Sequence, residues 1–323
     1  IVRNAILRSD ALIKAPSNDP FTAVAIAETM CEMAPDHPIT KHLSVAYWRG
    51  GDTDLEEQLY QPHNFEKIVA WGGLASVKHV TRYIQPGLEL IALDPKRSVS
   101  IVGREVFESD RLQDEAAVRL ATDIGAFNQV GCVNARVIYA LCGTDAAGVD
   151  RLNAFAARVY DAMLQLPPTI STTPKAYDRE LKAHLDAVRL DDDWYRVIGG
   201  EAGEGAIIVS QLQDPVDFAG MLADRTANLV PTNSLDDVVQ CTNAYTQTVG
   251  VFPETLKRDL RDVLPLYGAQ RFVSLGYAST AALASPQDGI EVLRRMGKWI
   301  TNEISTPDTV HPPWRPISEV IDA

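Results

Sequence analysis

Cys132 is the residue of this chain best suited to covalent chemistry. It lies in a segment from Gly125 to Arg136 in which a predicted helix ends, a small polar loop carries the thiol, and a predicted strand begins. Loops on rigid flanks often hold catalytic groups, and Gly131 beside the thiol leaves room for a substrate. Backbone N–H groups in such a loop can stabilise a thiolate or a developing oxyanion. Free cysteines are most often small buried core residues, so spacing alone leaves both interpretations open.

The other three cysteines fit the core interpretation. Cys31 and Cys241 lie in predicted helices and Cys142 lies in a predicted strand, each among apolar residues. We therefore expect these three thiols to be inert. Because the four cysteines form no C-x-x-C pair, the pattern favours a reduced, cytoplasmic compartment.

Two further segments have residues that can hold a phosphate or a ribose. Lys14 ends a predicted strand and is followed by Ser17. A cation and a hydroxyl at the carboxyl end of a parallel strand can bind either group. Gly72 and Gly73 lie between a predicted strand and a predicted helix, where a pyrophosphate can approach the helix amino terminus. The full G-x-G-x-x-G fingerprint is absent, so a solvated lysine and an ordinary tight turn remain as alternatives.

Several other functions find no support in the sequence. The six histidines show neither H-x-x-x-H nor H-E-x-x-H spacing, so we expect no metal site. The G-x-S-x-G elbow of serine hydrolases is also absent. With 30 Lys and Arg against 43 Asp and Glu, the net charge of −13 argues against nucleic-acid binding. No apolar run reaches the length of about 18 residues that a transmembrane helix needs.

The elements that must position these residues alternate between strand and helix. The expected strands are 11–14, 42–48, 67–71, 88–93, 98–102, 136–141, 206–210, 246–252 and 271–275. The expected helices are 20–34 with Asp19 as N-cap, 74–83, 114–127, 149–166, one ending at Leu190, and 291–302. Strand and helix in alternation predict a parallel sheet with right-handed crossovers, and hence the α/β class.

Four segments, in order along the chain, match one known pattern: residues 12–23, 69–77, 94–102 and 127–136. Together they resemble the aldehyde dehydrogenase superfamily and, within it, the LuxC-type acyl-CoA reductases. The resemblance implies a partial Rossmann-type cofactor domain over residues 1–125, an α/β catalytic thiol domain over 126–305 and an irregular tail over 306–323. It also implies the roles of the candidate residues: ribose contacts at Lys14 and Ser17, a pyrophosphate turn at Gly72 and Gly73, and catalysis at Cys132 and Asn128.

Two departures from the family pattern bear on the reaction. Hydrolytic relatives place a water-activating glutamate where this chain has Ala92, and Glu89 lies three residues earlier. The resemblance therefore implies that the acyl group of the acyl-enzyme is transferred to CoA, or that the acyl-enzyme is formed from acyl-CoA and reduced, rather than hydrolysed.

Many NAD-preferring relatives have a glutamate at the position of Ser17, whereas a serine beside Lys14 can accept a 2′-phosphate. This difference implies NADPH as the cofactor.

The resemblance thus predicts NADPH-dependent reduction of a fatty acyl-CoA to the aldehyde through an acyl-enzyme on Cys132. Two alternatives stay open: an NAD(P)-dependent aldehyde dehydrogenase working oxidatively, with or without CoA, and a non-catalytic module that binds acyl-CoA or a partner. Relatives are usually dimers or tetramers, so we expect a homo-oligomer. Relatives also have an N-terminal portion before the Lys14 segment, including an asparagine of the oxyanion hole. With Ile1 as first residue, we expect a chain that is incomplete at this end.

Overall fold

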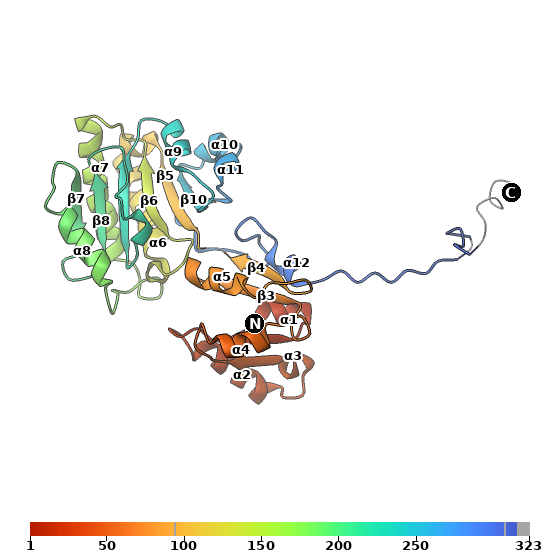
Figure 1. Ribbon diagram of the computed structural model, residues 1–323. Coiled ribbons are helices and arrows are strands. Elements are labelled where there is room, and N and C mark those ends of the chain that lie inside the picture. Colours follow the sequence, from red (N-terminus) through yellow and green to blue (C-terminus); the bar gives the residue numbers. More distant parts are fainter. Residues whose placement is uncertain (94, 307, 315–323) are drawn as a thin grey trace. The chain divides into compact units, whose positions relative to one another are not determined.

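The computed structural model describes residues 1–93, 95–306 and 308–314 (Figure 1). Within these ranges the chain forms two compact units, one of residues 1–49 with 292–306 and 308–314, the other between residues 50 and 291. The predicted boundary near residue 125 does not coincide with this division, and the assignment of cofactor and catalytic domains stays a prediction. Of the predicted tail, residues 307 and 315–323 lie outside the described ranges, as does Asp94 of the third matched segment.

The first unit is built on a two-stranded parallel sheet. Its elements are α1 (Val2–Leu7), β1 (Ala11–Lys14), α2 (Thr22–Met33), α3 (Pro38–Lys41), β2 (Leu43–Ala46) and α12 (Val292–Met296). β1 pairs with β2 in the register Ala11 to Leu43. α2 begins two residues later than predicted: Asp19 accepts a hydrogen bond from the backbone N–H of Thr22 at 3.1 Å, while Phe21 occupies the N-cap.

A second small parallel sheet begins the other unit. Its elements are α4 (Thr53–Leu59), β3 (Lys67–Trp71), α5 (Leu74–Thr81) and β4 (Glu89–Leu93). The buried Glu56 of α4 joins this part together, because its carboxylate lies 2.5 Å from His79 Nε2 and accepts the Tyr83 hydroxyl at 3.1 Å. A buried carboxylate needs such partners to offset its desolvation.

A seven-stranded sheet forms the main body of the second unit. In chain order its elements are β5 (Arg97–Val102), η1 (Arg104–Glu108), α6 (Asp110–Gly125), η2 (Ala126–Gln129), β6 (Ala135–Ala140), α7 (Ala146–Leu164), α8 (Arg179–Val188), β7 (Tyr195–Gly199), β8 (Ala206–Ser210), η3 (Ala219–Met221), β9 (Thr226–Pro231), α9 (Leu235–Cys241), β10 (Thr246–Phe252), α10 (Leu256–Leu260), α11 (Leu264–Tyr267) and β11 (Arg271–Ser274). The strand order is β11-β10-β5-β6-β9-β8-β7, parallel except for the antiparallel β7 at one edge. The predicted α/β class with a parallel sheet is confirmed, with this one antiparallel strand added.

Two hydrophobic cores lie on the two faces of this sheet. One joins Ile138 and Ala140 of β6 to α6 and α7 through Leu120 and Phe155. The other contains Val137 and Tyr139 of the same strand, packed with residues of α8, α9, α10 and α11. Successive residues of a strand point to opposite faces, so the alternation along β6 fills both cores.

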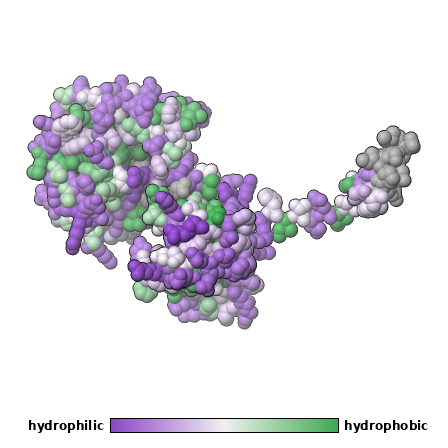
Figure 2. All heavy atoms as spheres, viewed as in Figure 1, coloured by the Kyte–Doolittle hydropathy of each residue, from purple (hydrophilic) through white to green (hydrophobic). Residues whose placement is uncertain are grey.

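Figure 2 shows that hydrophilic side chains dominate the visible surface, as this arrangement requires. None of the helices in the described ranges has the length and apolar character to cross a membrane.

Candidate active site around Cys132

Cys132 lies on a tightly held loop between η2 and β6, and its side chain is partly exposed. Phe127, Asn128 and Gln129 precede it with φ angles of 54°, 54° and 62°. Three successive non-glycine residues in the left-handed region are strained, and such a conformation persists only where surrounding contacts enforce it. The loop thus has a fixed shape that the sequence pattern alone did not indicate.

Two buried amides enforce this loop conformation. Gln129 donates to the carbonyl oxygens of Ala135 and Thr226 at 3.0 and 2.9 Å, and accepts from the Thr226 N–H at 2.8 Å. Asn134 accepts from the Gly131 N–H at 3.0 Å and donates back to carbonyl oxygens at the end of α6 and in η2. A Cβ at Gly131 would lie 2.9 Å from the Asn134 side chain, so glycine is needed for this packing. Fully satisfied buried networks of this kind rigidify what they hold.

Asn128, the second predicted catalytic residue, makes its hydrogen bonds away from the sulfur. Its Nδ2 donates to Thr172 Oγ1 at 3.0 Å, and its Oδ1 accepts from the Thr172 N–H at 2.7 Å and from Ser171 Oγ at 3.2 Å. The side chain therefore ties the Cys132 loop to residues 171 and 172. A catalytic role for Asn128 stays a prediction.

The groups that do contact Cys132 come from neighbouring strands. The Gln247 side chain, on β10, donates from Nε2 to Cys132 Sγ at 3.3 Å. Ser98, on β5, donates from Oγ to the Cys132 carbonyl oxygen at 2.7 Å and accepts from the Thr248 N–H at 3.3 Å. β10, β5 and β6 are adjacent in the sheet, and all these residues lie near the amino ends of their strands. Sequence reasoning missed Gln247 and Ser98; the only signal was their shared position at the start of a predicted strand.

Two arginines place positive charge near the sulfur. Arg136 donates to the Leu222 carbonyl oxygen at 2.8 Å and to that of Asn134 at 3.2 Å. Burial lowers its pKa, and Arg97 lowers it further, while the Cys132 charge acts in the opposite sense. Burial also lowers the pKa of Arg271, opposed by Asp123 and Cys132. Both guanidinium groups therefore lie within electrostatic range of Cys132.

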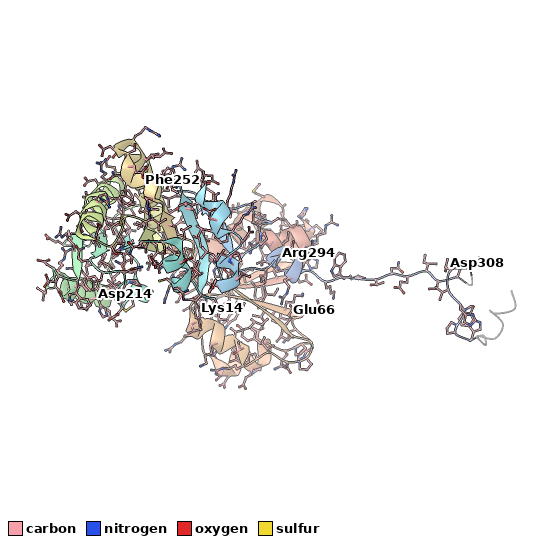
Figure 3. The ribbon with its side chains drawn as sticks, turned by 90° about the horizontal axis from the view of Figure 1, so that it is seen from above. Lys14, Glu66, Asp214, Phe252, Arg294 and Asp308 are labelled. Atoms are coloured by element: carbon pink, nitrogen blue, oxygen red, sulfur yellow. The ribbon has the colours of Figure 1, made fainter. Side chains whose placement is uncertain are left out.

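The predicted cofactor residues lie in separate compact units. Lys14 ends β1 in the first unit (Figure 3), with its Nζ 5.3 Å from the centroid of the Trp48 ring, and Ser17 is exposed in the turn that follows. Gly72 and Gly73 follow β3 in the second unit, and Gly73 is the N-cap of α5. Gly73 has φ −68° and a Cβ added there would meet nothing within 4 Å, so the fold itself does not require glycine at this position.

The predicted core location of the remaining cysteines is correct for one of them. Cys142 is buried, and burial raises the pKa of its thiol to about 11. Cys31 and Cys241 are exposed, so the core interpretation is wrong for both. They lie on α2 and at the end of α9, and a helix in contact with a core on one side leaves other positions open to solvent.

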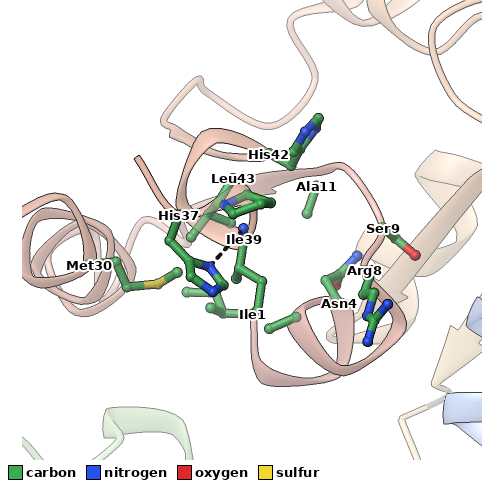
Figure 4. Close-up of a pocket in the computed structure, with 12 residues that line it drawn as sticks. Ile1, Asn4, Arg8, Ser9, Ala11, Met30, His37, Ile39, His42 and Leu43 are labelled. Carbon is green, nitrogen blue, oxygen red and sulfur yellow. Dashed lines mark hydrogen bonds between the residues drawn. The ribbon is translucent and has the colours of Figure 1, made fainter. Parts of the chain in front are cut away.

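The first unit also contains a cavity of about 510 Å³ (Figure 4). Its lining includes Arg8, Met30, His37 and His42, and none of the six predicted site residues. The imidazoles have structural partners, because His37 Nδ1 accepts from the Ile39 N–H at 3.2 Å and His42 Nδ1 contacts the Asp10 carboxylate. We assign no catalytic role to this cavity.

Comparison with known proteins shows the family of this chain. The model of the family described as "Acyl-CoA reductase (LuxC)" matches residues 1–299. The chain belongs to this LuxC family. It is 25% identical over 305 residues to a long-chain acyl-protein thioester reductase of Photobacterium phosphoreum, covering 94% of this chain and 59% of the relative. It is 28% identical over 313 residues to the protein of that name from Photorhabdus laumondii, covering 94% and 60%. The chain thus spans about three fifths of the length of these LuxC relatives.

Solved structures show the fold of this LuxC chain. The γ-glutamyl-γ-aminobutyraldehyde dehydrogenase of Burkholderia cenocepacia superimposes with a TM-score of 0.63 at 17% identity, covering 85% of this chain and 56% of that one. A lactaldehyde dehydrogenase gives a TM-score of 0.63 at 15% identity, covering 86% and 59%. The predicted aldehyde-dehydrogenase-like α/β fold is confirmed.

Proposed function

We propose that this chain carries the nucleophile of an NADPH-dependent reductase that converts a fatty acyl-CoA to the aldehyde through an acyl-enzyme on Cys132. The observation that carries the proposal is the environment of the sulfur: a partly exposed thiol on a fixed loop, with the Gln247 N–H 3.3 Å away and two guanidinium groups near it. A thiol held in this way is prepared for covalent catalysis.

The chemistry begins with attack of the Cys132 thiolate on the thioester carbonyl carbon. As the new carbon–sulfur bond forms and the bond to CoA breaks, CoA leaves as a thiolate that takes up a proton. Negative charge develops on the carbonyl oxygen, and backbone N–H groups can stabilise it. The Gly131 N–H is bonded to Asn134 Oδ1, whereas those of Cys132 and Val133 have no partner among the described residues. We assign these two N–H groups to the oxyanion.

NADPH, when bound, supplies the hydride that reduces the acyl-enzyme. The resulting thiohemiacetal on Cys132 collapses to aldehyde and regenerates the thiolate, so the thiol is unchanged after one turnover. Gly73 fits a pyrophosphate, because open space lies above it and α5 follows directly, with first-turn N–H groups suited to an anion. For Lys14 and Ser17 of the first unit, the family resemblance alone supports the proposed contacts to the ribose and its 2′-phosphate.

The alanine at position 92 supports an aldehyde as the product. By the family resemblance, Ala92 stands where hydrolytic relatives have their water-activating glutamate, and in the structure it lies on β4, paired with Ala70 of β3. The nearby Glu89 forms an ion pair with Lys67 at 3.0 Å on the neighbouring strand. An acyl-enzyme without an adjacent general base survives long enough to be reduced.

A second acyl donor is favoured by the names of the relatives. Those reported above are called acyl-protein thioester reductases, so an acyl group on a protein thiol is the alternative substrate. The attack by Cys132 is the same for both donors, and only the leaving thiol differs.

The test supplies the intact protein with NADPH and either a fatty acyl-CoA or an acylated carrier protein, and measures aldehyde formation. Cys132→Ala should abolish aldehyde formation from both donors, while Cys31→Ala, which removes an exposed thiol, should leave it unchanged. Full turnover by Cys132→Ala would refute the proposal. Turnover with the acylated carrier protein but not with acyl-CoA would show that the acyl-protein is the substrate.

A further inference from the structure

The Gln247 side chain links the sulfur of Cys132 to the carboxylate of Asp288. Gln247 donates from Nε2 both to Cys132 Sγ, at 3.3 Å, and to Asp288 Oδ1. An amide nitrogen carries two hydrogens, so one N–H group serves each acceptor. Gln247 is 3% exposed, and its Oε1 is buried without a partner in the described part of the chain. The side chain is therefore held by its nitrogen and not by its oxygen.

Asp288 determines which way the Gln247 amide points. Turning the amide over would place Oε1 against the Asp288 carboxylate, and two acceptors facing each other repel. With the carboxylate in place, an N–H group must face the sulfur. A thiolate accepts hydrogen bonds better than a thiol, because bonds to ionised groups are roughly twice as strong as neutral ones.

A tight turn fixes the position of Asp288. Gln287 and Ile290 exchange both backbone hydrogen bonds, at 2.9 and 3.0 Å, around the central pair Asp288 and Gly289. Both central residues have positive φ, 52° and 77°, which is the geometry of a type I′ turn with its preferred Asp-Gly sequence. This short turn restricts the conformations open to the carboxylate.

We propose that Gln247 is a catalytic hydrogen-bond donor to the Cys132 thiolate and that Asp288 is the positioning residue that aims its amide. The proposal rests on the proposed role of Cys132 as nucleophile and adds the groups that stabilise its reactive form. The charged groups facing the sulfur are Arg136 from β6, Arg271 from β11, and Asp288 itself through the amide. Asp288 thus has two opposing influences: its charge disfavours a thiolate, and its hold on Gln247 favours one.

Because the two influences of Asp288 act in opposite directions on the pH dependence of Cys132 reactivity, one measurement can distinguish them. The rate of iodoacetamide alkylation at Cys132 is measured between pH 5 and 10 in the intact protein by peptide mass spectrometry, without acyl donor or cofactor. Gln247→Met, which keeps the length but removes the donor, should slow alkylation at pH 7 about tenfold and raise the pH midpoint by about one unit. Asp288→Ala should raise the midpoint as well, because the amide is then free to turn its oxygen toward the sulfur. Asp288→Asn, which keeps an acceptor but removes the charge, should bring the midpoint back to the wild-type value or below it.

Matched controls separate this role from a structural one. Gln211→Met removes the same groups from a glutamine whose bonds go to Val209 and Asn153, and it should leave the Cys132 profile unchanged. Cys142 is buried, so its resistance to alkylation reports native packing in every variant. Should Gln247→Met lose that packing, the two Asp288 variants decide the question by themselves.

Two results would overturn the proposal: alkylation of Gln247→Met within twofold of the wild type, or a midpoint that falls in Asp288→Ala, as expected if Asp288 acted by charge alone. Because alkylation needs no substrate, failure of the proposed function would appear separately, as absent acyl transfer with the alkylation pattern intact.

Discussion

The Asp123 carboxylate on α6 accepts a hydrogen bond from the backbone N–H of Gly276 at 2.8 Å, and a second from that of Ala278 at 2.9 Å. These bonds connect α6, which leads into the Cys132 loop, to the segment that follows β11. Asp123 is 1% exposed, and burial raises its pKa to about 6, with the two N–H groups and Arg271 opposing the shift. The carboxyl that makes this connection therefore titrates near neutral pH.

Asp123 should make the stability of the fold fall as pH rises. Its pKa is higher in the folded chain than the value of about 3.9 expected when unfolded, so its contribution is fully present below pH 4 and is lost as pH passes through 6. A difference of about two units corresponds to about 3 kcal/mol. Asp123→Asn should remove this slope from urea-unfolding free energies between pH 4 and 7. An unchanged slope in the variant would show that Asp123 does not titrate in this range.

Asn134→Ala should destabilise the chain by about 2–3 kcal/mol, because it leaves the Gly131 N–H and several carbonyl groups in the loop without their partner. Asn153→Ala is the matched control, since that partly buried amide bonds only to the Gln211 side chain among the contacts described and should cost less than about 1 kcal/mol. Denaturant unfolding measures both. Equal losses in the two variants would contradict the special role of Asn134.

Ser17→Glu should shift cofactor preference from NADPH toward NADH. A carboxylate at this exposed turn repels a 2′-phosphate and can bind ribose hydroxyls, so kcat/KM with NADPH should fall about tenfold or more relative to NADH. Asn18→Glu places the same charge on the next exposed residue and should leave the ratio nearly unchanged. If kcat/KM with NADPH falls equally in both variants, the effect is general charge repulsion and Ser17 does not contact the 2′-phosphate.

Gly73→Ala should separate cofactor binding from folding. The backbone angles suit alanine and the added Cβ meets nothing within 4 Å, but alanine is a poorer N-cap than glycine, so the free energy of unfolding should fall by only about 1 kcal/mol. If a pyrophosphate uses this space, the KM for NADPH should rise about tenfold. Gly50→Ala, also in open space, should change neither quantity. An unaltered KM in Gly73→Ala would exclude Gly73 from the cofactor site.

The sequence predicted most elements of the sheet, and its failures have identifiable causes. The bounds of β3, β8 and β10 agree with the prediction. β9 was missed because it contains Asn228 and ends in proline, a pattern that argues against a central strand. In the structure Asn228 is fully buried, with its amide bonded to the Ile208 carbonyl and to Ser210 Oγ, both at 3.1 Å. Partners from another strand thus satisfy a polar residue that looks exposed in sequence.

The candidate site, like the sheet, could be predicted from the sequence only in part. Cys132 could be found from its local context, since a loop between a helix and a strand is visible in sequence. Gln247 and Asp288 could not, because they lie 115 and 156 positions further along the chain. Gln247 reaches the sulfur only through the strand order β10-β5-β6, and Asp288 reaches Gln247 only through its own turn. Strand order is a property of the whole sheet, and no local pattern encodes it.

The most direct test of the account is whether Cys132 itself becomes acylated. The intact protein is incubated with a fatty acyl-CoA in the absence of NADPH, digested, and examined by mass spectrometry for an acyl thioester on each of the four cysteines. We expect the acyl mass on Cys132, and its loss with release of aldehyde when NADPH is added. Aldehyde formation with no acyl group on Cys132 at any time would contradict the account.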